Sequence, residues 1–341
     1  MLTSRPVKAV VMREFGPPEV MRLEDVPTPA PGPGAVLVRV HAVSVNRTLD
    51  LAVRAGTYPA PVALPHVLGV DPCGVIEKVG PGVTTRKVGD RVTTLQLLRP
   101  ATAAAGPAIL GVHAWGGYAE YVAVPATLTH PIPDRLDFPT ATVVARHAPT
   151  ALSMLRDHAA LKRDEWVLVM GASGGLGSAG IQAARYLGAH VIAGAGADER
   201  VQAARDLGAD HGVNYRTQDL TEEVRRLTGG RGVDVVFENI ADPELFPRAF
   251  AALARNGRLV TAGAHGGGTV PLDVKRLYLN NISVIGSVGR IASDDLDLSL
   301  RAATEGRFRV LIDRVLPLTD AAHAHRIVAD RSGIGKIILQ P

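Results

Sequence analysis

The chain has 341 residues, a net charge of +4 and a hydrophobic fraction of 46%, which suit a globular protein of two domains, each with its own core. Only 4% of its residues are aromatic and its arginines are scattered singly, so we expect no nucleic-acid partner. The single cysteine, Cys73, excludes an intramolecular disulfide and a cysteine-based zinc cluster, and no stretch approaches the roughly 18 apolar residues of a membrane span, so we expect a cytoplasmic protein without membrane contact.

Short valine-rich runs separated by proline and glycine predict a β-rich first domain over residues 1–147. Its expected strands are Val7–Met12, Ala35–Val43, Gly74–Val79 and Asp90–Leu95.

The segment 166–187 predicts a strand, a glycine turn and a helix. Trp166–Met170 is an apolar run, and helical spacing resumes after the glycines. Glycines allow a tight exit from a strand, close approach of the backbone to a pyrophosphate, and close packing of helix on strand. The N–H groups and the dipole of the helix then hold the phosphates, so we favour a dinucleotide site over a plain tight turn. Its expected residues are Gly171, Ser173, Gly174, Gly175, Leu176 and Gly177.

Strands and helices alternate from residue 148 to residue 290, which predicts an open, doubly wound parallel sheet of six strands. The tail, 291–341, is expected to complete the first domain. The further strands expected in the sheet are His190–Ala193, Gly212–Tyr215, Val233–Phe237, Arg258–Ala262 and Ile282–Ser287. The expected helices around it are Asp198–Leu207, Thr217–Leu227 and Leu245–Leu253. The tail is expected to add helices near 293–305 and 320–329 and strands Ile312–Leu316 and Lys336–Leu339.

Motifs along nearly the whole chain resemble those of the medium-chain dehydrogenase/reductase superfamily. This resemblance implies a GroES-like catalytic domain, formed from both ends of the chain, and a Rossmann domain for NAD or NADP. The motifs are Pro65–Gly80, Lys87–Val92, Gly116–Tyr121, the turn at 166–187, Leu207–Asp210, Gly257–Val260 and Gly335–Leu339.

The zinc enzymes of this superfamily hold a catalytic metal through a cysteine, a Gly-His-Glu motif and a further cysteine or aspartate. Aligned on the resemblance, those positions hold Asn46, Gly69–Asp71 and a residue near Arg146. Zinc needs three or four well-placed His, Cys or carboxylate ligands. The remaining candidates have no ligand-like spacing, so we predict no metal; they are His66, Asp71, His113 and His147.

The chain is therefore similar to the zinc-independent branch, which contains quinone oxidoreductases of the zeta-crystallin type and related enone reductases. The segments at Asn46 and at Gly56–Pro59 resemble the active-site region of that branch. The branch usually has aspartate three residues after the asparagine, whereas here Asp50 lies four after Asn46, so the substrate pocket is expected to differ. Asn46, Thr48 and Tyr58 are candidate hydrogen-bond donors to a carbonyl oxygen. For Arg146, an oxyanion partner and a structural charge both stay open.

NADPH is the expected cofactor. The position near Ala195, where NAD enzymes carry an acid, has none. Arg200, Tyr215 and Arg331 match residues that line the adenosine phosphate in NADP-preferring relatives, although Arg200 could be a solvated helix residue and Tyr215 a packed sheet edge. The loops that follow the later strands should border the nicotinamide through Asn239, Gly263, Ala264 and Ser287.

The resemblance implies hydride transfer from NADPH to a quinone or to a carbon–carbon double bond conjugated to a carbonyl. A zinc-free alcohol or aldehyde dehydrogenase and a non-catalytic NADPH-binding protein remain alternatives. A homodimer is expected through the last strand of the parallel sheet, because the family often pairs that strand across a two-fold axis.

Overall fold

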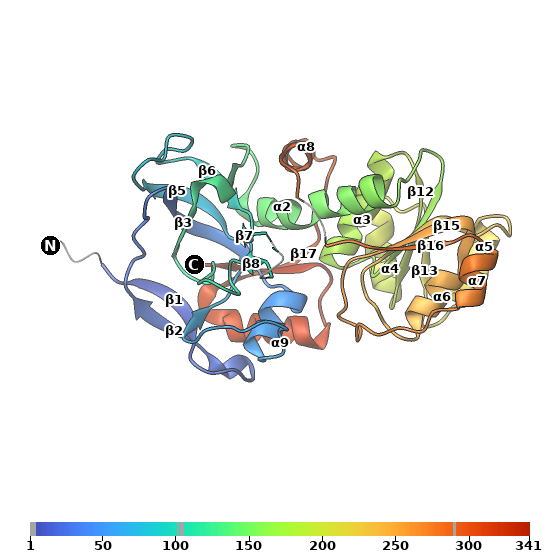
Figure 1. Cartoon of the computed structure of the whole chain (residues 1–341), viewed down its shortest axis with the longest axis horizontal. Coiled ribbons are helices and arrows are strands. Elements are labelled where there is room, and N and C mark those ends of the chain that lie inside the picture. Colours follow the sequence, from blue (N-terminus) through green and yellow to red (C-terminus); the bar gives the residue numbers. More distant parts are fainter. Residues whose placement is uncertain (1–4, 101, 103–105, 289–290) are drawn as a thin grey trace. The chain divides into compact units, whose positions relative to one another are not determined.

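The computed structural model describes residues 5–100, 102, 106–288 and 291–341. The chain divides into two compact units, and the elements of each are labelled in Figure 1. Unit 1 comprises residues 1–146 and 312–341, and unit 2 comprises residues 147–311. Within the described ranges, no helix is long and apolar enough to cross a membrane.

Unit 1 is built mainly on antiparallel β-structure, with β17 and β18 as a parallel pair. Its largest sheet has the strand order β10-β6-β5-β3-β18-β17, and β9 pairs with β3 off this path. A second sheet has the order β2-β1-β4, and β7 pairs with β8. The strands are β1 (Val7–Met12), β2 (Met21–Val26), β3 (Ala35–Ser44), β4 (His66–Val67), β5 (Cys73–Val79), β6 (Arg91–Thr94), β7 (Leu97–Arg99), β8 (Ala108–Ile109), β9 (Tyr121–Pro125), β10 (Thr129–Pro131), β17 (Ile312–Pro317) and β18 (Lys336–Gln340).

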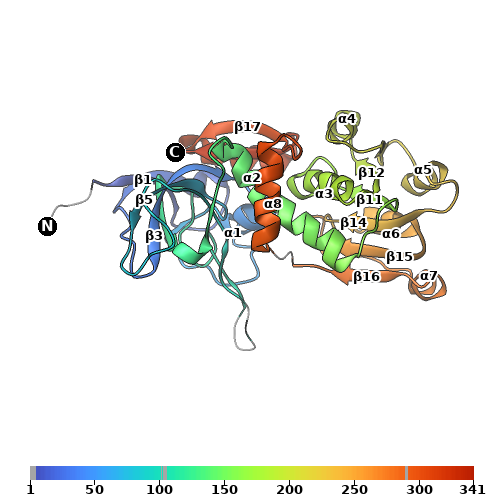
Figure 2. The same cartoon turned by 90° about the horizontal axis from the view of Figure 1, so that it is seen from above.

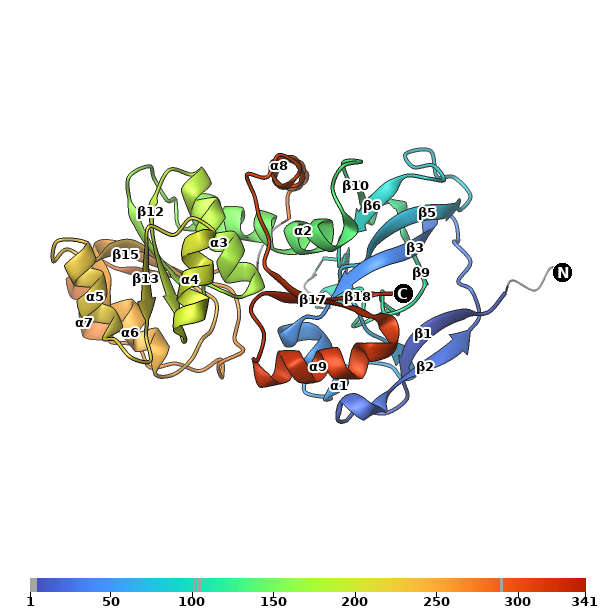
Figure 3. The same cartoon turned by 180° about the vertical axis from the view of Figure 1, so that it is seen from behind.

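The two ends of the chain meet in unit 1. The last strand, β18, pairs antiparallel with β3 through Ile338↔Ser44 and Leu339↔Val43. Figure 3 shows helix α9 (Ala321–Asp330) lying along β17 and β18. The short helix α1 (Ala52–Arg54) follows a π-helical turn at Arg47–Leu51. Helix α2 (Phe138–Leu152) begins in unit 1 and continues past the division at residue 146.

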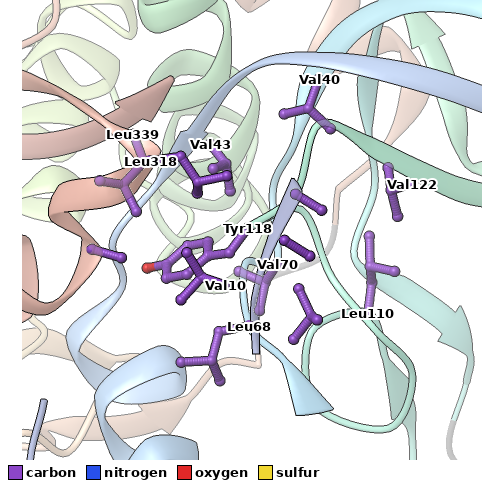
Figure 4. Packing of buried hydrophobic residues seen from close by; sticks show 14 of the residues in the cluster. Val10, Val40, Val43, Leu68, Val70, Leu110, Tyr118, Val122, Leu318 and Leu339 are labelled. Atoms are coloured by element: carbon purple, nitrogen blue, oxygen red, sulfur yellow. The ribbon is translucent and has the colours of Figure 1, made fainter. Parts of the chain in front are cut away.

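The core of unit 1 surrounds the ring of Tyr118, which is fully buried. Side chains from both ends of the chain, including Val10, Leu68, Leu318 and Leu339, belong to the same buried cluster (Figure 4). The Tyr118 hydroxyl is 3.2 Å from Nε2 of His325 on α9. The C-terminal segment is therefore part of the core of the N-terminal one.

Unit 2 is an open parallel sheet with the strand order β13-β12-β11-β14-β15-β16. Figure 2 labels β11, β12, β14, β15 and β16 of this sheet. The chain starts at the middle strand, β11, and winds outward in both directions, so a ligand is expected at the carboxyl edge where the order reverses. The strands are β11 (Trp166–Met170), β12 (His190–Ala195), β13 (His211–Asn214), β14 (Val233–Glu238), β15 (Leu253–Thr261) and β16 (Ser283–Gly286). The helices are α3 (Gly175–Tyr186), α4 (Asp198–Asp206), α5 (Leu220–Leu227), α6 (Leu245–Ala251), α7 (Val274–Leu279) and α8 (Ser293–Thr304).

The prediction of an α/β protein with a β-rich, GroES-like domain and a six-stranded Rossmann sheet is confirmed. The division of the chain differs from the expected one: residues 291–311, which we expected to complete the first domain, belong to unit 2 and include α8, and unit 2 begins at His147 rather than at residue 148. Arg156 explains this, because its guanidinium donates to both carboxylate oxygens of Asp295 on α8, at 2.7 and 2.9 Å.

Several elements have no counterpart among the predicted ones. They are β2, β4, β7, β8, β9, β10, α1, α2 and α7. Helix α2 carries Pro149 and several threonines and valines, which are weak helix formers, so its sequence did not stand out as helical. Helix α7 has only six residues and is recognisable mainly from its N-cap, where Asp273 accepts a hydrogen bond from the backbone N–H of Arg276.

Candidate active site

The glycine turn of unit 2 has the geometry of a phosphate-binding loop. Gly171 leaves β11 with φ +61°, a conformation that favours glycine. A Cβ on Gly177 would lie 2.1 Å from the carbonyl oxygen of Gly171, so only glycine lets α3 pack this close to the strand. The first backbone bond at this end of α3 runs from Ser178 N to Gly174 O. The N–H groups of residues 175–177 precede it and stand at the positive end of the helix dipole, which suits a pyrophosphate.

Three other predicted cofactor residues follow neighbouring strands at the same carboxyl edge of the sheet. Asn239 follows β14, and its Nδ2 donates to the carbonyl oxygen of Met170 at 2.7 Å. Gly263 follows β15 and packs against the segment after β14, where a Cβ on it would lie 2.6 Å from the carbonyl oxygen of Asn239. Ser287 follows β16, and its backbone N–H donates to Thr261 O. The structure therefore gathers these residues beside the glycine turn, and Ala264 follows Gly263 in an exposed loop.

Glu238 organises this edge and was not among the predicted site residues. The side chain is buried, and its Oε1 accepts hydrogen bonds from the backbone N–H groups of Ile240 and Ala241. Its Oε2 accepts from the Thr261 hydroxyl at 2.8 Å, which joins the loops after β14 and β15. In the sequence, the feature that could have identified Glu238 is a charged residue at the end of an apolar strand.

On the other half of the sheet, the ring of Tyr215 lies against Gly196. A Cβ on Gly196 would be 3.1 Å from Cε2 and from the hydroxyl oxygen of Tyr215. Arg200 lies in the first turn of α4, four residues beyond Gly196. The nearest acid, Asp198, accepts a hydrogen bond from Nδ2 of the buried Asn214 at 2.7 Å. Tyr215 therefore lies at the exit of β12, Arg200 follows in the first turn of α4, and Asp198 is already bonded within the protein.

Unit 1 contains a buried polar cluster that we call the 44–336 cluster: Ser44, Asn46, Asp50, Asp71 and Lys336. One half of it centres on Asp71, which accepts from the Ser44 backbone N–H at 2.9 Å, from the Ser44 hydroxyl at 2.5 Å and from Asn46 Nδ2 at 3.1 Å. Asn46 Nδ2 is also 3.2 Å from the carbonyl oxygen of Ser44. The amide hydrogens of Asn46 are therefore engaged within the protein.

The other half of the 44–336 cluster binds the two ends of the chain together. Lys336 Nζ, from β18, donates to Asn46 Oδ1 and to the carbonyl oxygen of Val45, both at 2.8 Å. Asp50 accepts from the backbone N–H groups of Asn46 at 2.7 Å and Gly69 at 3.0 Å. Lys336 is 7% exposed and Asp50 is fully buried. The carboxamide of Asn46 is thus held between the buried ammonium group of Lys336 and the buried carboxylate of Asp71.

Burial also shifts the acid–base properties of the cluster. It raises the pKa of Asp50 to about 7, and the negative charge of Asp71 adds to that rise. It lowers the pKa of Lys336 to about 8, against the opposing effect of the two aspartates. Burial lowers the pKa of Arg146 as well, again opposed by the charges of Asp71 and Asp50. Arg146 therefore belongs to the electrostatic surroundings of the cluster.

The remaining predicted residues of unit 1 lie outside these bonds. Thr48 is exposed on the π-helical turn, and Tyr58 is half-buried with its ring edge against His113, at 6.4 Å between centroids. In the described part of the chain, no hydrogen bond joins either hydroxyl to Asn46. Arg331 ends α9 in a left-handed conformation with φ +52°. It belongs to unit 1, whereas Arg200 and Tyr215 belong to unit 2.

No group of three or more His, Cys, Asp or Glu side chains that could hold a metal ion occurs among the described residues. His66, one of the four candidates considered from the sequence, has its Nε2 3.0 Å from the carbonyl oxygen of Gly111. Asp71 is bonded to Ser44 and Asn46 as described above.

Sequence reasoning did not identify the 44–336 cluster. It treated Asp50 only as a departure from a motif and Lys336 only as part of a strand. A lysine placed directly before the apolar run Ile337–Leu339 was the available signal, because a buried strand does not normally begin with a charge.

Comparisons with known proteins agree with both units. Residues 32–134 match the alcohol dehydrogenase GroES-like domain family, and residues 175–305 match the zinc-binding dehydrogenase family. The quinone oxidoreductase of Sus scrofa is 33% identical over 342 residues, covering 98% of this chain and 97% of that protein. The 2-haloacrylate reductase of a Burkholderia species is 33% identical over 356 residues, covering 98% of this chain and 99% of that protein.

A solved structure gives the same result. The crystal structure of an NAD-dependent alcohol dehydrogenase superposes with a TM-score of 0.88 at 37% identity, covering 98% of this chain and 99% of that one. This chain therefore belongs to the medium-chain dehydrogenase/reductase superfamily, in its quinone oxidoreductase branch, whose members are oxidoreductases that use a nicotinamide cofactor.

Proposed function

We propose that this chain is an NADPH-dependent reductase that transfers hydride, without a metal ion, to a quinone or to an α,β-unsaturated carbonyl compound. The observation that carries the proposal is the 44–336 cluster. The position that holds a zinc-binding cysteine in the zinc enzymes is occupied by Asn46, whose carboxamide lies between Lys336 and Asp71. A buried ammonium group at this place opposes a divalent cation, so the donor set does not fit zinc.

The cofactor assignment rests on the residues of unit 2. Gly171 to Gly177 would hold the pyrophosphate through backbone N–H groups, and Arg200 and Tyr215 would border the 2′-phosphate. The bound nicotinamide supplies the hydride that the acceptor receives. Asn239, Gly263, Ala264 and Ser287 would orient it, because they follow strands at the same edge of the sheet as the glycine turn.

The acceptor site is assigned to unit 1. Thr48 and Tyr58 carry hydroxyl groups that can donate to a carbonyl oxygen. Asn46 becomes a positioning residue in this proposal, because its amide hydrogens already contact Asp71 and Ser44.

A homodimer is part of the proposal. Strand β16 is the edge strand of the parallel sheet, and Val284 on it is 40% exposed. The neighbouring helix α7 exposes Val274, Tyr278 and Leu279. A second copy of the chain can pair with an apolar edge strand of this kind. Size-exclusion chromatography with light scattering would measure the mass of the resulting dimer.

The test is loss of reduced-nicotinamide absorbance with NADPH and with NADH, using benzoquinone and cyclohexenone as acceptors. We expect NADPH oxidation that neither a chelator nor added zinc changes. Activity that a chelator abolishes and zinc restores would contradict the metal-free proposal.

The cofactor preference can be tested separately. Arg200→Gln should weaken NADPH binding about 10- to 100-fold and leave NADH binding unchanged, since a charge-assisted hydrogen bond contributes about 1.5–3 kcal/mol. Arg205→Gln, an exposed arginine on the same helix, is the control. Equal losses for the two cofactors would assign Arg200 a structural role.

A second candidate function is a zinc-free alcohol dehydrogenase, which the 37% identity to an NAD-dependent alcohol dehydrogenase favours. It predicts oxidation of alcohols by NAD⁺ or NADP⁺, whereas the reductase does not. Tight NADPH binding without turnover of any acceptor or alcohol would indicate a non-catalytic nucleotide-binding protein.

A further inference from the structure

Arg146 lies on a face of helix α2 that packs along strand β3. Phe138, Thr142 and Arg146 are spaced by four residues and therefore share one face of the helix. Phe138 stacks on His41 with 4.6 Å between ring centroids, and the Thr142 hydroxyl is 3.5 Å from the carbonyl oxygen of Ala42. Since β3 continues from Ala42 to Ser44, the next turn of α2 carries Arg146 toward the 44–336 cluster.

The surroundings of Thr142 lead to the same position. Its hydroxyl also contacts the thiol of Cys73, at the start of β5. Asp71 lies two residues before Cys73, and its negative charge acts on Arg146. The contacts of α2 with β3 and with the start of β5 thus both lead toward the 44–336 cluster.

The Nε of Arg146 is buried and has no hydrogen-bond partner among the described residues. Two other arginines of unit 1 are bonded: Arg47 donates to the carbonyl oxygen of Val328, and Arg86 donates to the Thr129 hydroxyl and carbonyl oxygen. The buried Arg54 also has its Nε and Nη1 without a partner among the described residues. A guanidinium group carries five N–H donors, and leaving a buried one unpaired is costly. An acceptor atom from outside the protein would remove that cost.

The carboxylates near Arg146 are already bonded elsewhere. Asp71 accepts three hydrogen bonds from Ser44 and Asn46, and Asp50 accepts two from backbone N–H groups. They attract the guanidinium group by charge without using its donors. The donors of Arg146 are consequently available to a ligand oxygen.

We propose that Arg146 is a catalytic residue, whose guanidinium group donates hydrogen bonds to the oxygen of the conjugated carbonyl group of the acceptor. This inference rests on the proposed function. Hydride adds to the β-carbon of the acceptor, the carbon–carbon π pair moves to form the enolate, and the negative charge arrives on the oxygen bound by Arg146. The bound nicotinamide would supply the hydride and its two electrons, so the acceptor is reduced; water then protonates the α-carbon and leaves as hydroxide. Guanidinium donors aimed at the developing charge stabilise the transition state.

The oxygen could belong to a ketone or to a carboxylate, because both can accept from a guanidinium fork. Cyclohexenone and acrylate distinguish the two sources. If the natural acceptor is a conjugated carboxylate, acrylate should be reduced with the lower KM; if it is a ketone, cyclohexenone should.

The experiment compares wild-type protein with Arg146→Gln, Arg146→Lys and Arg146→Ala, and with Arg135→Gln as the matched control. Arg135 is exposed just before α2. We expect Arg146→Gln to lower kcat about 10²- to 10³-fold, as loss of an oxyanion donor does. Arg146→Lys should retain an intermediate kcat, added guanidinium ion should restore turnover to Arg146→Ala but not stimulate wild type, and NADPH affinity should be unchanged in all variants. The unchanged NADPH affinity also shows that the variants fold.

An Arg146→Gln variant with kcat and KM within threefold of wild type would overturn the inference while leaving the proposed function intact. If wild-type protein reduces no acceptor, the proposed function fails, and calorimetric titration with acrylate then tests Arg146 alone. At least tenfold weaker acrylate binding by Arg146→Gln would support the inference, and equal or undetectable binding by both proteins would overturn it.

Discussion

The candidate site of unit 2 consists mainly of backbone atoms, whereas that of unit 1 consists of buried side chains. In unit 2 the glycine turn presents backbone N–H groups at the start of α3, and the nearby polar side chains mostly form hydrogen bonds with other backbone groups. In unit 1, side chains from segments almost 300 residues apart form the 44–336 cluster. A site formed by backbone atoms tolerates a substitution wherever the Cβ of the new residue would not clash with neighbouring atoms. A cluster of buried charges tolerates little, because each member compensates another.

The largest effect is expected from removing the cation of the cluster. Lys336→Met would leave Asp50 and Asp71 without a nearby buried ammonium group, which should lower the free energy of unfolding by about 3–5 kcal/mol in urea denaturation. The matched control is Lys8→Met, because Lys8 pairs with Asp25 at an exposed site. That variant should stay within about 0.5 kcal/mol of wild type.

A double variant sharpens this test. Lys336→Met combined with Asp50→Asn removes one charge of each sign, so it should cost less than the sum of the two single changes. Additive losses in the free energy of unfolding would show that the two charges do not compensate each other. Unit 1 would then not differ from unit 2 in its sensitivity to single substitutions.

The next largest effect concerns the backbone site. Gly177→Ala would place a Cβ 2.1 Å from the carbonyl oxygen of Gly171, so α3 must move away from β11. We expect a loss of about 1–3 kcal/mol in unfolding free energy together with loss of NADPH binding, measured by fluorescence titration.

Gly174→Ala is the control for this change, because its Cβ would lie 3.3 Å from the same oxygen. Its stability should remain close to that of wild type. If both alanines are tolerated equally, close packing at Gly177 is not what restricts the turn.

A smaller effect is expected on the pH dependence of stability, where two buried groups of unit 1 act in opposite directions. Burial lowers the pKa of His325 to about 3, so the unfolded chain binds its proton first and stability falls as pH decreases below about 6.5. The raised pKa of Asp50 acts the other way: its contribution to stability is lost as pH rises from about 4 toward 7. Either slope is at most about 1.4 kcal/mol per pH unit.

Single variants separate the two slopes. His325→Gln should leave the Asp50 slope, so stability falls between pH 4 and pH 7, whereas Asp50→Asn should make stability rise over the same range. The measurement is urea denaturation at several pH values. Parallel pH profiles for the two variants would contradict these assignments.

The smallest effect is expected at Cys73, which borders the cluster without bonding to it. Burial raises the pKa of its thiol to about 12, so the reactive thiolate is nearly absent at neutral pH. A thiol reagent should leave the activity of native protein unchanged and titrate one group only after unfolding. Rapid labelling of the native protein would show that this part of unit 1 opens.

Most of unit 2 could be predicted from the sequence, because its elements are local. Strands such as Trp166–Met170 are continuous apolar runs, and the turn after it needs glycine at particular positions. Helix ends were less predictable: α5 begins at Leu220 rather than Thr217, because Asp219 caps it by accepting from Glu222 N. Helix α2 was missed because its stability comes from packing rather than from helix-forming residues.

The sequence by itself determined the superfamily, the α/β architecture and the glycine turn, since each depends on patterns within short segments. Only the tertiary structure decided which side chains meet in unit 1. Asn46 and Lys336 lie 290 residues apart, and the 2.8 Å bond between them follows from the pairing of β18 with β3. Asp71 is 3.1 Å from Asn46 and comes from the segment before β5. Among the described residues the Nε of Arg146 has no partner, and the bonds that Asp71 accepts come from Ser44 and Asn46, at and just after the end of β3.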